Sequence, residues 1–283
     1  DLSPTWMLCV RLKLFTPLLV VIAALPSWAA PLPFEELLYK GTASSYYGIP
    51  AEAQQERYAT LLQRGSIAER LAGIARSLRL KRNLNVGFES CGSANAYFRP
   101  DTSSVVFCYE MVDLIVRTAK ADPGFAGPPE QPGFDRLVTS VIVAIYLHEL
   151  GHALIGINGV PFTGRDEDVA DQFFMYVAAQ NLEPRGARVV LAAAWFFKAL
   201  SKQRDLSQSG ELSQVLADEH SLDMQRTFNL ACWAVGSGQE WGLVPAAYVG
   251  LPQQRAVRCG DEFAKLNQGI GARFRRYLKP TAS

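Results

Sequence analysis

Two of the three histidines in this 283-residue chain lie four residues apart, in the segment H-E-L-G-H at residues 148–152. Residues at this spacing share one face of an α-helix, so both imidazoles can reach a single metal ion. Glu149 lies beside them, where its carboxylate can take a proton from a water molecule that attacks a carbonyl group. The flanking residues are almost all apolar, which indicates a buried helix whose charged groups need partners or a metal. The pattern therefore predicts a zinc site, one ion per chain, with His148 and His152 as ligands and Glu149 as general base.

Zinc needs a third protein ligand, and acidic residues follow the histidines after a turn rich in Gly and Pro. Glu167 and Asp171 are four residues apart, so they share a face of the next predicted helix. We expect Glu167 to bind zinc and Asp171 to accept the N–H of a ligating histidine, with Asp168 as the competing third ligand. The alternative is an acidic helix N-terminus that serves the helix dipole, which explains one or two of these carboxylates.

The histidine segment at 148–152 and the acidic segment at 167–171 together resemble the gluzincin metallopeptidases. In those enzymes H-E-x-x-H is followed by E-x-x-x-D, often as E-x-x-A-D. The resemblance implies that Glu167 binds zinc and that Asp171 orients a histidine. Asn95-Ala96-Tyr97 is similar to the Asn-Ala-aromatic edge strand of those enzymes. This second similarity implies a strand that lies above the zinc and pairs with the substrate backbone.

From about residue 67 onward, the chain also resembles a bacterial family that is assigned to the metallopeptidases. The similarity extends beyond the zinc segments to three blocks, at residues 91–97, 107–110 and 218–226. It implies a zincin-type body and an activity on peptide bonds.

The third histidine, His220, lies in a predicted helix, where it falls with Asp223 in a row of leucines. Polar groups in such a row face inward and need partners. We interpret His220 as a donor to the oxyanion that forms during attack on a carbonyl group, held in place by Asp223 or Asp218. The alternative is a structural network that includes Arg226 and Asn229.

The remaining patterns predict an α+β fold, a small antiparallel sheet with an edge-strand hairpin packed on a largely helical body. Three short runs of strand-forming residues occur at 85–88, 95–98 and 105–109, and a turn between the last two indicates the hairpin. Helical periodicity occupies 51–80, 110–120 and, after a linker rich in Gly and Pro at 123–133, five segments at 134–157, 165–181, 184–203, 211–235 and 252–278.

The first 29 residues have the layout of a secretory signal peptide, with residues 1–6 as a mis-called extension. A short basic stretch precedes an apolar run over 14–25, and Ser27 and Ala29 are the small residues that a cut after Ala29 needs. The run is too short to span a membrane comfortably. We therefore expect a flexible mature N-terminus at residues 30–50, a single domain over 51–283 and no stable membrane span.

Four cysteines follow the leader, and an even number is typical of a disulfide-bonded protein in an oxidising compartment. Three pairings are possible, and local closure favours Cys91 with Cys108 and Cys232 with Cys259. A zinc–thiolate site is the alternative, but no C-x-x-C spacing occurs in the sequence. The sequence thus predicts a secreted or periplasmic protein.

The 28 Lys and Arg residues almost balance the 27 Asp and Glu residues, which argues against a nucleic-acid partner. These features predict an exported zinc-dependent peptidase that acts on a peptide or protein. A catalytically silent, zinc-stabilised peptide-binding protein of the cell envelope is the alternative. Glu149 discriminates between them, because a binding protein needs no carboxylate beside the metal.

Overall fold

A computed structural model describes residues 38–129, 131–182, 185–203 and 221–279. The predicted leader at 1–29 lies outside these residues. The first half of the described chain forms a four-stranded sheet with helices that cover it. Its elements are β1 (Ala43–Tyr47), α2 (Ala53–Arg64), α3 (Ile67–Arg76), β2 (Leu84–Glu89), β3 (Ala96–Arg99), β4 (Ser104–Cys108), α4 (Tyr109–Ala121) and the short α5 (Pro123–Ala126).

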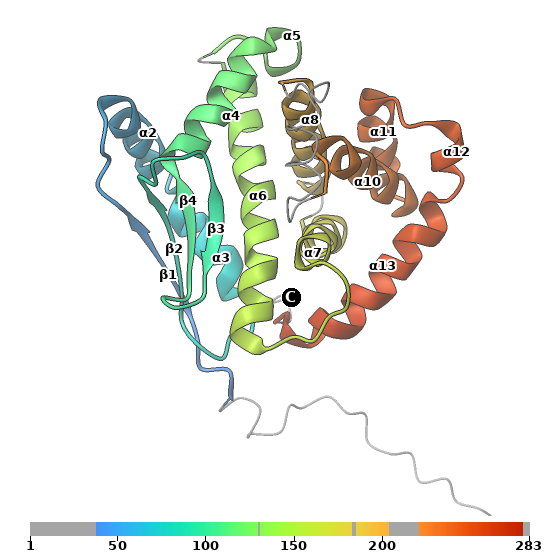
Figure 1. Ribbon diagram of the computed structural model, residues 1–283, viewed down its shortest axis with the longest axis horizontal. Coiled ribbons are helices and arrows are strands. Elements are labelled where there is room, and N and C mark those ends of the chain that lie inside the picture. The colour runs from blue at the N-terminus through green and yellow to red at the C-terminus, as the bar shows by residue number, and fades with distance from the viewer. Residues whose placement is uncertain (1–37, 130, 183–184, 204–220, 280–283) are drawn as a thin grey trace, which may run out of the picture.

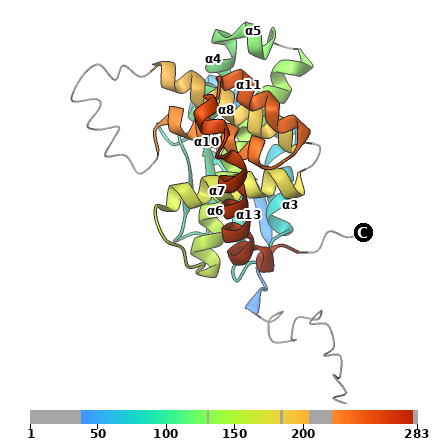
Figure 2. The same cartoon turned by 90° about the vertical axis from the view of Figure 1, so that its right-hand side faces the viewer.

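The second half is helical and begins with α6, which stands between the sheet and the remaining helices (Figure 1). α10 packs on both α8 and α13, and the turned view places α13 in front of α7 (Figure 2). The elements are α6 (Pro132–Asn158), α7 (Asp166–Asn181), α8 (Gly186–Gln203), α10 (Asp223–Gly236), η1 (Glu240–Gly242), α11 (Leu243–Val249), α12 (Gln253–Ala256), α13 (Cys259–Phe274) and η2 (Arg275–Tyr277). The predicted α+β class is confirmed.

The sheet is mixed, whereas the sequence predicts an antiparallel one. The strand order is β1-β2-β4-β3, and β1, β2 and β4 run parallel to one another. Two helices connect β1 to β2, and a helical connection of this kind brings the next strand back in the same direction. The predicted hairpin is confirmed, because β3 pairs antiparallel with β4 at the sheet edge.

The prediction of a flexible segment at residues 30–50 is wrong for Ala43–Tyr47, which form β1. Its Ser and Tyr residues beside Gly and Pro are typical of a loop, and this composition concealed the strand. Pairing with β2 supplies the missing stabilisation, and the ring of Tyr47 stacks on Phe88 with centroids 5.9 Å apart. Long-range partners such as these are absent from a local pattern.

The helices differ from the prediction in four further places. The predicted linker contains α5, the predicted C-terminal helix is divided into α12 and α13, and α11 was not predicted. The helix predicted for 211–235 begins only at Asp223, within the described residues, because Ser221 and Leu222 are not helical. Leu222 has the extended backbone of an N-cap residue, and its N–H donates to the side chain of Gln225 at 3.2 Å. The predicted helix therefore does not include Ser221 and Leu222, and His220 lies outside the described residues.

α6 is apolar over most of its length after the first turn, and its side chains form the centre of the core. It is also the one helix among the described residues that is long and apolar enough to cross a membrane, by length and composition alone. Its most apolar window is 72% buried within the protein, as expected for a core helix. The histidines of α6 therefore lie between the sheet and the C-terminal helices.

Two glycines set the geometry of the α6–α7 hairpin. A Cβ atom at Gly151 would lie 3.2 Å from Ala170 Cα, so the absence of a side chain lets α7 approach the histidine-bearing turns of α6. Gly159 ends α6 with a φ of 66°, a left-handed conformation that favours glycine. The chain then reverses and brings the first turn of α7 back to the histidines.

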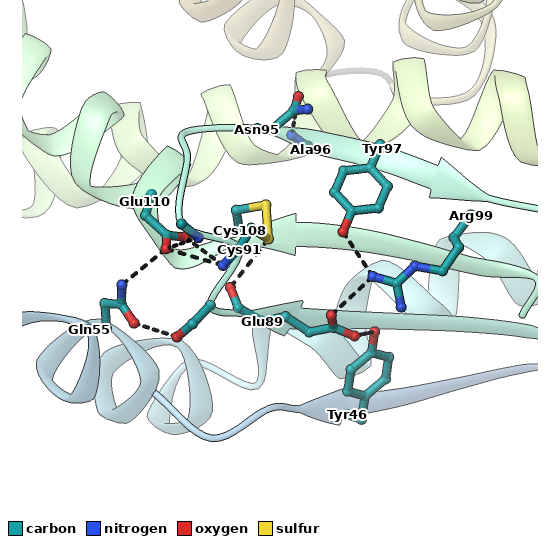
Figure 3. The surroundings of a disulfide bond; sticks show 12 residues. Tyr46, Gln55, Glu89, Cys91, Asn95, Ala96, Tyr97, Arg99, Cys108 and Glu110 are labelled. Carbon is teal, nitrogen blue, oxygen red and sulfur yellow. Dashed lines mark hydrogen bonds and ion pairs between the residues drawn. A yellow bond between two sulfur atoms is a disulfide. The ribbon is translucent and has the colours of Figure 1, made fainter. Parts of the chain in front are cut away.

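Two disulfide bonds link Cys91 to Cys108 and Cys232 to Cys259. These are the two pairs that local closure favours. The first holds the loop before β3 against the end of β4, where Glu110 also accepts backbone N–H groups from Cys91 and Gly92 (Figure 3). The second holds α10 against α13. Disulfide bonds are typical of proteins in oxidising compartments.

Peptide mapping under non-reducing conditions should therefore recover a Cys91–Cys108 peptide and a Cys232–Cys259 peptide. We expect both disulfide bonds to form completely when the protein is expressed in an oxidising compartment, because the surrounding backbone already holds the two cysteines of each pair close together. Free thiols at all four positions in the mature protein would contradict this pairing and would remove the support for export.

Candidate metal centre

The side chains of His148, His152 and Glu167 converge between α6 and α7. One ligand atom from each lies within 4.8 Å of the others. The Nε2 atoms of the two histidines are 3.1 Å apart, and the Glu167 carboxylate lies 2.9 Å from His148 Nε2 and 3.3 Å from His152 Nε2. The structure thus brings together the three residues that the sequence predicts as metal ligands.

This donor set fits zinc. Around a tetrahedral zinc ion with bonds of ~2.0 Å, neighbouring ligand atoms are ~3.3 Å apart, close to the separations found here. Two imidazole nitrogens and one carboxylate leave a fourth position for water or substrate, as in catalytic zinc sites. One other group of ligand-type side chains lies close together in the described part of the chain, but it consists of Cys91, Cys108 and Glu110, and its two sulfur atoms are bonded to each other.

Each histidine is oriented by a carboxylate at its other ring nitrogen. His148 Nδ1 lies 2.8 Å from Asp171 Oδ1, and His152 Nδ1 lies 3.0 Å from Asp166 Oδ2. An N–H donated to a carboxylate from Nδ1 fixes the tautomer in which Nε2 carries the free lone pair. Both lone pairs then face the centre. Asp171 has the position predicted for it, whereas Asp166 was not predicted.

Asp171 is in turn clamped by Arg226, which reaches it from α10. The guanidinium group donates from Nε to Asp171 Oδ2 at 2.8 Å and from Nη2 to Oδ1 at 2.7 Å. Its Cζ atom lies 4.0 Å from the centroid of the Phe197 ring. Both charged residues are buried, and burial of such a pair is tolerated only when its hydrogen bonds are made. The sequence instead offered Arg226 as a member of a network with Asn229 around His220, whereas the structure joins Arg226 to Asp171 on α7 and Asn229 to Arg255.

The electrostatics of the centre favour a bound cation. Burial opposes the charged form of His148, but the carboxylates of Asp171 and Glu167 outweigh it and raise the pKa of His148 to about 9. Burial likewise opposes ionisation of Asp171, yet Arg226 and His148 hold the pKa of this carboxyl well below its usual range. A proton and a metal compete for the same imidazole nitrogens, so metal binding releases protons and is weaker at acidic pH.

Replacement of Asp171 by Asn is expected to lower zinc affinity by about 10–100-fold, because the amide leaves His148 without its charged acceptor. Competition with a fluorescent chelator measures this change. Asp101→Asn, on the exposed turn between β3 and β4, is the matched control and should bind zinc like the wild type. Equal affinities for Asp171→Asn and the wild type would show that Asp171 does not position the ligand.

Two cavities flank the centre and meet at Glu149, which is 6% exposed. Asn95 and Ala96 also border both cavities, and they lie at the start of the edge strand β3 beside α6 (Figure 3). Tyr97 borders the second cavity, and its hydroxyl accepts a hydrogen bond from Arg99 at 2.8 Å. The predicted general base and the predicted substrate-binding residues therefore lie along one cleft.

The remaining predicted site residues lie near the same cleft or outside the described residues. Asp168 turns to Ser221, whose Oγ donates to its Oδ1 at 3.0 Å, and Asp168 is absent from the ligand group. Asp223 is buried at the start of α10 and borders the first cavity. His220 lies outside the described residues, so its role stays a prediction.

Sequence reasoning missed two residues of the centre. Asp166 immediately precedes the third ligand, and the sequence analysis assigns it no role. Arg226 was assigned to a network around His220. The spacing of Arg226 from Asp171 along the chain carries no signal, because only the packing of α10 on α7 and α8 joins them.

Comparison with known proteins gives one family. A family model whose description is "Putative metallopeptidase" matches residues 47–270. Searches of the curated proteins and of the solved structures found no match. The matched region contains α2 to α12 in full, together with the three converging residues of the centre and both disulfide bonds.

Proposed function

Because the chain belongs to the putative metallopeptidase family, we propose that it is an exported, zinc-dependent peptidase. The observation that carries the proposal is the convergence of His148, His152 and Glu167 beside Glu149 in a cleft bordered by an edge strand. The donor set supports zinc. The two disulfide bonds support an oxidising, extracytoplasmic location, which agrees with the predicted leader.

Zinc held by the three ligands would polarise the scissile carbonyl and make water more acidic. Glu149 would take the proton of the attacking water and deliver it to the leaving amine nitrogen. Asp171 and Asp166 would keep both imidazoles in the tautomer that the metal needs. His220, which lies outside the described residues, stays the predicted donor to the oxyanion that would develop on the carbonyl oxygen.

The edge strand β3 would align the substrate. Among the described strands, β3 pairs with β4 alone, so its other edge is open to an extended peptide. Main-chain hydrogen bonds to Asn95–Tyr97 would hold the peptide in register with the metal. This edge equally suits the alternative function, a peptide-binding protein that does not cleave.

Native mass spectrometry and metal analysis of the purified mature protein test whether the protein binds zinc, on which the proposal depends. We expect one zinc ion per chain. A protein that takes up no zinc from a buffered solution would contradict it. A protein that binds one zinc and holds peptides but never cleaves them would support the alternative function.

A further inference from the structure

The loop that leads into β3 has little packing to hold it in place. Residues 92–95 are exposed, and a cavity of about 310 Å³ is bordered both by residues 92–94 and by residues of α2 and α4. The loop ends at Asn95 and Ala96, which border both cavities of the metal centre. Since the loop does not pack closely on the helices, hydrogen bonds and the disulfide bond must determine its position.

Glu110, in the first turn of α4, contacts this loop through its side chain. Its carboxylate accepts the N–H of Cys91 at 3.1 Å and the N–H of Gly92 at 2.7 Å (Figure 3). The amide of Gln55, which is buried on α2, donates to the same carboxylate at 3.2 Å. Burial opposes ionisation of Glu110, yet hydrogen bonds from backbone N–H groups, its own among them, hold the pKa of this carboxyl below its usual value. Hydrogen bonds to a charged acceptor are stronger than neutral ones, so the carboxylate holds the loop firmly.

The disulfide bond alone does not fix the path of the loop, because it attaches the chain only at Cys91. Gly92 follows with a φ of 77°, and a Cβ atom there would meet no other atom within 4 Å. Glycine populates many backbone conformations, so this residue is a flexible joint unless a contact holds it. The hydrogen bond from its N–H to Glu110 is such a contact.

The start of β3 depends on the loop for its position. The strand has four residues and pairs only with β4 among the described strands, so few main-chain hydrogen bonds hold it. Its far end is also held by Arg99, which donates to Glu89 at 3.2 Å. At the near end, the carbonyl group of Asn95 accepts the N–H of Cys108 at 3.0 Å. The near end lies beside the metal centre, so the position of the loop decides how well a peptide can pair there.

We propose that Glu110 is a positioning residue for the substrate, because its carboxylate fixes the loop and thereby the first residues of β3 in the conformation that pairs with an extended peptide. This inference rests on the proposed function, which assigns peptide binding to β3. Without the carboxylate, only a fraction of the molecules have the competent conformation, and the apparent Kd of a peptide rises by the inverse of that fraction. Glu110 borders neither cavity of the metal centre, so zinc should bind as before.

Binding of fluorescently labelled casein, an unfolded protein with many extended segments, tests this role without cleavage. Fluorescence anisotropy is measured with zinc-loaded protein that carries Glu149→Gln. Addition of Glu110→Ala should raise the Kd about 10-fold, as expected when about one molecule in ten keeps the loop in place, and should leave zinc affinity unchanged.

The conservative variant Glu110→Gln should restore most of the binding. One oxygen of Glu110 already accepts both N–H groups, and the amide keeps such an oxygen. Its Kd should be roughly 2–5-fold above that of the Glu149→Gln parent, since a neutral acceptor makes weaker hydrogen bonds. This variant carries the test should Glu110→Ala fail to fold, and a Kd equal to that of the parent would then overturn the inference.

Cleavage of casein by protein with an intact Glu149 gives a second readout, the division of the effect between KM and kcat. Glu110→Ala should raise KM about 10-fold and leave kcat within about twofold, because the change removes only binding. Glu262→Ala is the matched control, since Glu262 is also a half-buried residue in the first turn of a helix, α13, beside the other disulfide bond. It should leave Kd, KM and kcat unchanged.

The outcomes separate this role from the proposed function. Casein binding that Glu110→Ala does not change, or no casein binding by the Glu149→Gln protein, would overturn the inference and leave the peptidase to be judged by cleavage. A fall in kcat at constant KM, or loss of zinc, would also overturn it, since the carboxylate would then support the metal centre. Casein that is bound in a Glu110-dependent way but never cleaved would support the inference and contradict the peptidase.

Discussion

Replacement of Glu149 by Gln is expected to lower kcat by about 10²–10⁴-fold while the protein keeps its zinc. The amide preserves the shape of the side chain but cannot accept a proton from the attacking water. Glu149 is buried on α6 beside His148 and borders both cavities, so it faces the place where water and substrate meet. Steady-state kinetics and metal analysis of the same preparation measure both quantities.

Glu56→Gln is the matched control, since Glu56 lies exposed on α2 and should not affect turnover. Two results would contradict the role of Glu149. Loss of zinc in Glu149→Gln would mean that the residue supports the metal centre structurally, and undiminished turnover would mean that another group takes the proton.

The second large effect concerns the third ligand. Glu167→Ala should leave two histidines, and zinc affinity should fall by more than about 100-fold, beyond the loss expected for a residue that only orients a ligand. The Glu167 carboxylate is within 3.3 Å of the Nε2 atoms of both histidines, so its removal takes away the one acidic ligand of the group. Chelator competition at fixed pH measures the affinity.

Asp168→Ala is the control for this experiment, because Asp168 is the next residue along α7 and its carboxylate bonds to Ser221. It should bind zinc almost like the wild type. The reverse pattern, in which Asp168→Ala empties the centre and Glu167→Ala does not, would make an aspartate the third ligand and remove the gluzincin assignment.

Local patterns were sufficient to predict the elements that hold the centre. The spacing of His148 and His152 depends only on helical geometry, and the helix predicted for 134–157 is observed as α6 at Pro132–Asn158. Glycine and proline after it predict the reversal that brings Glu167 and Asp171 back to the histidines. Each of these signals lies within about 25 residues of sequence, where the chain itself restricts the geometry.

Features that depend on distant contacts were not predictable in this way. Arg226 reaches Asp171 only because α10 packs across α7 and α8, and the strand β1 exists only because it pairs with β2. The parallel direction of β1, β2 and β4 follows from the crossover connections, which a pattern of alternating residues does not encode. The cavity that extends from His148 and Glu149 is also a product of packing, since five separate helices, α4, α6, α7, α8 and α10, contribute to its wall.

One measurement tests the central claim, that this protein cleaves peptides at a zinc centre held by His148, His152 and Glu167. The rate of cleavage of a mixed peptide library is followed for one preparation as purified, after removal of the metal by a chelator, and after zinc is restored to one equivalent. We expect cleavage in the first sample, none in the second and recovery in the third. Cleavage that persists without metal, or no cleavage by the fully zinc-loaded protein, would contradict the account.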